Sequence, residues 1–203
     1  MKVLLINGSP RKSGNTFTAL TEIAQTLQTE GIDSEIVWIG TKPVRGCIAC
    51  GRCKTNGDGK CVFDDDICNR ISEKFNEADG FVFASPVYYG QPNGALLAVM
   101  QRAFFSNGAN VQNKPAAALT ICRRGGATAA IQALQMMNMP VATSQYWNIA
   151  YGREPGQVAQ DTEGMQTMRT LAHNLAWMLR GLRSDSAPAV PAREEWQPMH
   201  FIR

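Results

Sequence analysis

The sequence lacks several features that mark large classes of proteins. It has no apolar run approaching the ~20 residues of a membrane-spanning helix, so we expect no membrane association. A net charge of +3, without any block rich in lysine and arginine, argues against nucleic acid as a partner. An apolar strand pattern begins at once, which leaves no room for a signal peptide, and we expect a cytoplasmic protein.

Familiar catalytic patterns are also absent. The two histidines, His173 and His200, lie too far apart in the sequence to suggest a shared site, and we interpret His173 as a packing or surface residue. There is no Ser-His-Asp pattern and no HExxH motif. The six cysteines are not expected to form structural disulfides if the protein is cytoplasmic.

Residues 3–16, VLLINGSPRKSGNT, have the pattern of a buried strand, a polar loop and a helix N-terminus in succession. Free N–H groups and the helix dipole favour an anion at such a place. The loop has neither Gly-Lys-Ser/Thr nor GxGxxG, so we interpret it as a site for a terminal phosphate monoester. The candidate ligands are Ser9, Arg11, Ser13, Asn15 and Thr16. The alternative is that Ser13 or Asn15 only caps the helix.

Strand and helix patterns alternate five times along the chain. The predicted strands cover residues 3–6, 35–39, 80–85 and 116–122, with a fifth inside 139–149. The predicted helices cover residues 16–30 and 67–76, a segment around 95–104, a segment ending near 137, and 162–182. This alternation predicts an α/β fold, a doubly wound parallel sheet with helices on both faces. Five strands with one phosphate loop predict the flavodoxin-like order 2-1-3-4-5, with the ligand at the carboxyl ends of the strands.

Two more loops are expected at that edge of the sheet. The third strand runs into a rigid aromatic rim that suits a flat heteroaromatic ring, formed by Pro86, Val87, Tyr88, Tyr89 and Gly90. The fourth strand runs into Arg123, Arg124, Gly125 and Gly126, where the glycines allow close approach of a ligand and an arginine could meet a phosphate. The alternatives are that the tyrosines cover the sheet edge and that the arginines are solvated surface charges.

The segment of about residues 43–66 is too long for an ordinary connection. Its cysteines have the spacing C-x2-C-x2-C-x7-C, and the first three repeat the spacing by which ferredoxins hold a [4Fe–4S] cluster. Structural zinc prefers two separated pairs. The candidate ligands are Cys47, Cys50, Cys53 and Cys61. The alternatives are zinc, free thiols without a stable cluster, and Cys68 as fourth ligand in place of Cys61. We interpret Cys122 as a buried apolar residue.

We expect one domain over residues 1–183, followed by an extended tail over residues 184–203 that contains three prolines. The tail also carries large apolar side chains, which a disordered tail would have fewer of: Trp196, Met199, Phe201 and Ile202. We expect it to pack on a neighbouring subunit, and the alternative is packing on its own domain.

The motifs GSPRKSGNT and SPVYYGQPNG, with their order and spacing, resemble the NADPH-dependent FMN reductase group over nearly the whole chain. The compact cysteine motif resembles the iron–sulfur flavoproteins, a branch of that group. The resemblance implies FMN, with its phosphate on the candidate ligands of the first loop. Its ring would lie against residues 86–90 and the Gly125–Gly126 loop. The four cysteines would hold a [4Fe–4S] cluster.

The resemblance also implies an activity. FMN would take electrons from NAD(P)H or reduced ferredoxin, and the cluster would pass them singly to a small-molecule or protein acceptor. Since the flavin carries the chemistry, no catalytic side chain is expected. Homodimers or homotetramers would bring the cluster near the flavin of a neighbouring subunit. Two alternatives stay open: an NAD(P)H-dependent FMN or quinone reductase without a cluster, and a non-catalytic zinc-containing module that binds a phosphate ligand.

Overall fold

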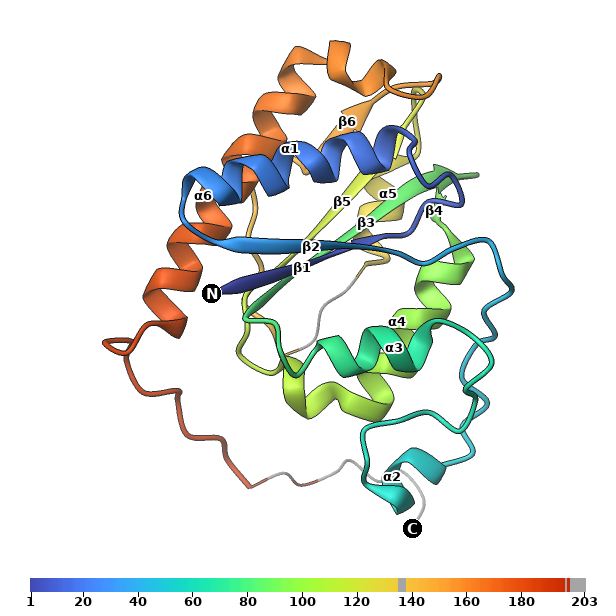
Figure 1. The fold of residues 1–203 in the computed structure, drawn as a ribbon, viewed down its shortest axis with the longest axis vertical. Helices are drawn as coiled ribbons and strands as arrows, with labels where there is room; N and C mark the ends of the chain where they lie inside the picture. Colours follow the sequence, from blue (N-terminus) through green and yellow to red (C-terminus); the bar gives the residue numbers. More distant parts are fainter. Residues whose placement is uncertain (135–137, 196, 198–203) are drawn as a thin grey trace.

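The fold is an α/β sandwich around a parallel sheet (Figure 1), seen in a computed structural model that describes residues 1–134, 138–195 and 197. The strands β1 (Lys2–Asn7), β2 (Asp33–Trp38), β3 (Gly80–Tyr88), β5 (Ala116–Cys122) and β6 (Ile149–Tyr151) pair in the order β2-β1-β3-β5-β6. The predicted fold class and strand order are therefore confirmed. A two-residue strand, β4 (Gln91–Pro92), pairs antiparallel with β3, so the sheet has one strand more than predicted.

Helices cover both faces of the sheet, as predicted. The helices are α1 (Asn15–Thr29), α2 (Arg52–Asn56), α3 (Cys68–Lys74), α4 (Gly94–Asn107), α5 (Ala127–Gln132) and α6 (Thr162–Arg183), with 3-10 turns η1 (Gly108–Val111) and η2 (Gln157–Gln160). Alternate residues of the central strands face opposite layers. Leu5 packs in the core beneath α1 and α6, whereas Leu4 and Phe83 pack with α3 and α4. Burial on both faces explains why these strands read as continuous apolar runs.

The predicted fifth strand was misplaced, because β6 begins at Ile149, where the predicted segment ends. Earlier in that segment, Val141 forms only an isolated bridge with Ala116. The chain then leaves the sheet through a polar loop, in which the Asn148 side-chain amide donates to the Ala118 carbonyl at 3.0 Å and Ser144 donates to Asn148 at 2.9 Å. These side-chain bonds replace ladder hydrogen bonds, so the strand resumes only at Ile149.

Other boundaries differ less. Helix α5 ends at Gln132, short of the predicted end near 137, and residues 135–137 lie outside the described part of the chain. The short helix α2 was not predicted, and it lies between two glycines with positive φ, Gly51 and Gly57. In the described residues no helix is both long and apolar enough to cross a membrane.

The tail begins where α6 ends at Arg183. Its residues 187–195 form neither helix nor strand. The apolar residues on which subunit packing was predicted (Trp196, Met199, Phe201 and Ile202) lie outside the described residues, as does His200. Packing of the tail therefore stays a prediction.

Candidate functional site

The carboxyl ends of β1, β3, β5 and β6 meet at one edge of the sheet (Figure 1). In the parallel register, Asn7 of β1 lies beside Ala84 of β3, and Cys122 of β5 lies beside Tyr151 of β6. The loops that follow these four strands therefore converge. This is the edge at which the sequence predicts a ligand.

The loop after β1 is held in shape by its own side chains. The Asn7 side-chain oxygen accepts the Ser9 backbone N–H at 3.0 Å, and the Ser9 hydroxyl accepts the Arg11 backbone N–H at 3.1 Å. The Trp38 ring N–H donates to the Ser9 carbonyl at 2.7 Å from the neighbouring strand. Asn7 and Ser9 are both buried. These hydrogen bonds within the protein hold the loop in one conformation.

The N-terminus of α1 carries no side-chain cap in the described structure. Its N-cap residue is Gly14, and its first turn has no acidic residue. Ser13 does not cap the helix, and the Asn15 side-chain oxygen instead accepts the Val158 backbone N–H at 3.2 Å. The capping interpretation of Ser13 and Asn15 is therefore wrong. The uncapped N–H groups are suited to an anion.

A cavity of about 210 Å³ opens beside this helix end. It is lined by residues of the predicted phosphate loop and ring loop together: Ser9, Arg11, Asn15, Thr16, Pro86, Val87 and Tyr88. Ser13 is exposed and is not among the lining residues. The loops after β5 and β6 add two guanidinium groups that the phosphate-loop pattern did not include, Arg123 and Arg153. The cavity thus combines anion donors with the rim predicted for a flat ring.

The loops after β3 and β5 touch each other. Gly126 has a φ of +83°, and a Cβ at this position would lie 2.9 Å from the Gly90 Cα. Glycine is therefore required at residue 126 both for its backbone conformation and for this close approach. Tyr89, also at positive φ, has a fully exposed side chain, so it does not cover the sheet edge. Tyr88 is 48% exposed and borders the cavity.

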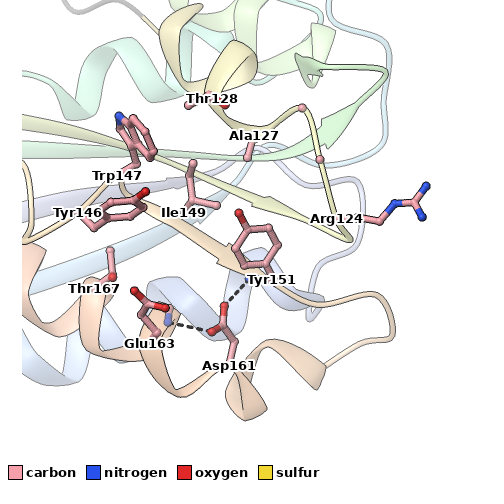
Figure 2. Close-up of a pocket in the computed structure, with 13 residues that line it drawn as sticks. Arg124, Ala127, Thr128, Tyr146, Trp147, Ile149, Tyr151, Asp161, Glu163 and Thr167 are labelled. Atoms are coloured by element: carbon pink, nitrogen blue, oxygen red, sulfur yellow. Dashed lines mark hydrogen bonds between the residues drawn. The ribbon is translucent and has the colours of Figure 1, made fainter.

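A second cavity, of about 440 Å³, is lined by Gly125 and Gly126, which were predicted to contact the ring but do not line the first cavity. Figure 2 shows the rings of Tyr146, Trp147 and Tyr151 around it, and Arg124 extending away. Two backbone N–H groups, of Tyr151 at 2.7 Å and Gly164 at 3.0 Å, donate to the Asp161 carboxylate at its floor. Burial, aided by the nearby thiol of Cys122 and the Asp161 charge, raises the pKa of Tyr151.

Sequence reasoning missed this aromatic cavity. Tyr151 is the last residue of β6, so it stands at the same sheet edge as the predicted loops. Because the fifth strand was predicted within residues 139–149, Tyr151 was not recognised as a residue at the carboxyl end of a strand. The signal available in the sequence was the short apolar run at Ile149–Tyr151. The arginine pair was also treated as one group, whereas Arg123 borders the first cavity and Arg124 the second.

The predicted cysteine ligands line one small cavity next to α4. Cys47 and Cys50 are exposed, Cys53 is buried and Cys61 is half-buried. The backbone N–H of Ala49 donates to the Cys47 sulfur at 3.4 Å, and Ala49 has a positive φ. Among the described residues, no group of three or more His, Cys, Asp or Glu side chains is arranged to hold a metal ion. The donor set consists of thiols, which suit iron–sulfur clusters and zinc.

The remaining cysteines lie elsewhere. Cys68 is fully buried in the core, its thiol donates to the Val99 carbonyl at 3.8 Å, and burial raises its pKa to about 12. It does not line the cysteine cavity, which disfavours it as a fourth ligand. Cys122 is buried as predicted, burial raises its pKa, and it borders the first cavity. His173 pairs with Glu30 at 2.6 Å on the surface.

Comparison with known proteins decides the family. The family model for NADPH-dependent FMN reductase matches residues 1–154. The chain belongs to this family. An iron–sulfur flavoprotein of Methanocaldococcus jannaschii is 33% identical over 192 residues, which cover 89% of this chain and 98% of the relative. An iron–sulfur flavoprotein of Methanosarcina thermophila is 33% identical over 195 residues, which cover 91% and 98%.

The fold comparison agrees with this family. A solved structure of an archaeal flavodoxin superposes with a TM-score of 0.55 at 15% identity, covering 86% of this chain and 99% of the flavodoxin. At that identity the likeness concerns the fold alone. Family membership identifies the chain as a flavin-dependent oxidoreductase and supports FMN as its cofactor. The individual residues that contact FMN stay predictions.

Proposed function

We propose that this FMN reductase family member is an iron–sulfur flavoprotein. In this proposal it passes electrons between NAD(P)H or reduced ferredoxin and a small-molecule or protein acceptor. The observation that carries the proposal is the convergence of Cys47, Cys50, Cys53 and Cys61 on one cavity. Relatives that align over almost their full length carry the name iron–sulfur flavoprotein, which supports the same interpretation.

The residues of the first cavity fit FMN. The uncapped N-terminus of α1 and the hydroxyls of Ser9 and Thr16 would bind the phosphate, with Arg11 adding a charge-assisted bond. The apolar wall of Pro86 and Val87 would pack against the ring. Bound FMN supplies two-electron acceptance and one-electron release. The protein's own part is to orient the ring and to keep its phosphate fixed.

The residues that line the cysteine cavity fit an iron–sulfur cluster, both in their chemistry and in their positions. The lining of their cavity contains thiols but no carboxylate and no imidazole. Positive φ at Ala49, Gly51, Gly57 and Gly59 gives the segment tight turns around that cavity. Since the thiols are not arranged as a metal site in the described structure, we propose that cluster binding draws them together. A bound [4Fe–4S] cluster supplies one-electron transfer.

The two sites lie apart within one chain. The short helix α2 of the cysteine segment lies beside α4 (Figure 1), and the cysteine cavity shares no lining residue with the FMN cavity. We therefore propose that a homodimer or homotetramer brings the cluster of one subunit near the FMN of another. Deleting residues 196–203 should weaken this assembly. An unchanged mass by light scattering would refute that role of the tail.

An ultraviolet–visible spectrum of protein purified without air, with iron, sulfide and zinc analysis, tests the proposal. Flavin bands with a broad cluster shoulder and about four irons per chain are expected. Flavin without metal would instead support an NAD(P)H-dependent FMN or quinone reductase, a second candidate favoured by the lack of a preformed metal arrangement among the described residues. Zinc without flavin, even after addition of FMN, would leave the non-catalytic zinc module.

A further inference from the structure

Arg102 carries a positive charge on a face of α4 whose neighbouring residues are buried and apolar. It lies on α4 between the buried residues Val99 and Ala103, and its side chain is 0% exposed. Burial of a guanidinium is costly unless the charge is paired and its N–H groups are hydrogen-bonded. The partners of Arg102 therefore indicate why the charge is there.

The guanidinium contacts four acceptors. It forms an ion pair with the carboxylate of Asp66, whose side chain is only 3% exposed. It donates to the carbonyls of Phe63 at 2.9 Å and Arg45 at 3.3 Å, and its Nε–H donates to the Cys61 sulfur at 3.2 Å. A planar guanidinium can satisfy such a set at once, whereas a lysine ammonium cannot.

These acceptors come from both ends of the cysteine segment. Arg45 precedes the first ligand cysteine by two residues, and Cys61, Phe63 and Asp66 follow the turn that contains α2. In Figure 1 this segment runs beyond α3 and α4 and carries only α2 as regular structure. One side chain of α4 thus ties both ends of the segment to the folded domain.

We propose that Arg102, oriented by Asp66, is a positioning residue for the iron–sulfur cluster. It holds Cys61 as the fourth ligand and raises the reduction potential of the bound cluster. This inference rests on the proposed function. An N–H bond directed at a ligand sulfur stabilises the more negative, reduced cluster more than the oxidised one, and such bonds are among the factors that set cluster potentials. Because Asp66 balances the guanidinium charge, the directed N–H bond carries the effect rather than net charge.

The test compares R102K with the matched variant R45K in the holoprotein. Arg45 is exposed, and its guanidinium pairs with Asp65 and stacks on Phe63 at 4.5 Å. Iron and sulfide are measured first, and the cluster potential is then titrated by electron paramagnetic resonance, with the flavin potential as internal reference. R102K should lower the cluster potential by about 59 mV or more, a tenfold change in a one-electron equilibrium. R45K and the flavin should not shift. A fully loaded R102K with the wild-type potential would overturn the inference.

A second measurement covers the case in which R102K does not fold or does not load. Wild-type protein is prepared with arginine labelled with nitrogen-15, and the reduced cluster is studied by pulsed electron paramagnetic resonance. A coupling to the labelled nitrogen is expected from the Nε–H bond to Cys61. A loaded cluster without this coupling would overturn the inference. Wild-type protein without iron would contradict the proposed function itself, so the two failures are distinguishable.

Discussion

The predicted phosphate loop (residues 8–14) and the cysteine segment are built in opposite ways. The loop between β1 and α1 is short, and a buried asparagine, a serine hydroxyl and a tryptophan N–H fix its conformation. The segment between β2 and α3 contains only the five-residue helix α2, and Cys47 and Cys50 are exposed. Arg102 connects both ends of this segment to α4. Hydrogen bonds within the fold therefore shape the predicted phosphate loop, whereas the four thiols line one cavity without the arrangement of a metal site among the described residues.

The strengths of the bonds explain this difference. A phosphate is held by several weak hydrogen bonds, so a loop that had to order itself on binding would lose much of their free energy. Thiolate–metal bonds are strong enough to organise a flexible segment, as they do when small metal domains fold. We therefore expect substitutions in the predicted phosphate loop to weaken FMN binding gradually. Substitution of a proposed ligand cysteine should instead abolish cluster binding.

The largest effect is expected from C53S. Cys53 is the buried member of the ligand set, and a serine hydroxyl is a poor replacement for a thiolate in an iron–sulfur site. If the proposed [4Fe–4S] cluster is present, iron should fall from about four per chain to nearly none. FMN affinity should stay within about twofold of wild type, since the two cavities share no lining residue. Iron analysis and a flavin titration measure both. Loss of FMN together with iron would show that the two sites depend on each other.

A graded effect is expected from S9A, with S13A as the matched control. Ser9 lines the cavity proposed for FMN, whereas Ser13 is exposed and does not line it. S9A removes the proposed bond to the phosphate and also the acceptor of the Arg11 backbone N–H, which holds the loop in shape. Loss of one hydrogen bond to a charged phosphate alone costs about 1.5–3 kcal/mol, so the Kd for FMN should rise at least roughly tenfold. Quenching of flavin fluorescence on binding gives the Kd. Equal weakening by S13A would mean that the loop rearranges around the phosphate.

The sequence patterns predicted the sheet because its signals are local. The apolar run of β1 and the helical spacing of α1 depend only on neighbouring residues, and they located both elements closely. The spacing of the four cysteines was also a local signal, and the structure brings all four to one cavity. The misplaced β6 shows the limit, because pairing with β5 rather than composition selected Ile149–Tyr151.

The contacts of Arg102 could not be predicted from such local patterns. Its contact with Cys61 spans 41 residues of sequence, and that with Asp66 spans 36. Within α4 the pattern marked an amphipathic helix, and an arginine at a core position carries no indication of which acceptors it meets. The aromatic cavity of Tyr146, Trp147 and Tyr151 was likewise formed by a loop and a strand end that only the fold brings together.

A smaller effect is expected from C68A, which tests whether Cys68 belongs to the core or to the ligand set. Burial raises the folded-state pKa of Cys68 from 9.0 to about 12, so the buried thiol contributes stability fully below pH 9. The contribution is lost as the pH rises from 9 towards 12, by about 1.4 kcal/mol per pH unit, because only the unfolded chain ionises readily.

Urea unfolding in the presence of a reductant measures this contribution. The stability advantage of wild type over C68A should shrink by about 1.4 kcal/mol between pH 8 and pH 10. The iron content of C68A should equal that of wild type, because Cys68 does not line the cysteine cavity. A loss of iron in C68A would transfer the role of fourth ligand from Cys61 to Cys68.

The smallest effect is expected from D65N, within the cysteine segment itself. Asp65 pairs with Arg45 at 2.6 Å, but both side chains are more than half exposed. An exposed ion pair contributes about 0–1 kcal/mol, so stability, iron content and FMN affinity should all stay close to wild type.

The matched variant is D66N, one residue further along the chain. Asp66 pairs with the buried guanidinium of Arg102, so D66N should lower the free energy of unfolding by about 3–5 kcal/mol. Thermal unfolding of the two variants side by side measures the contrast. Similar losses would mean that the whole segment, rather than the Arg102 contact alone, is ordered before the cluster binds.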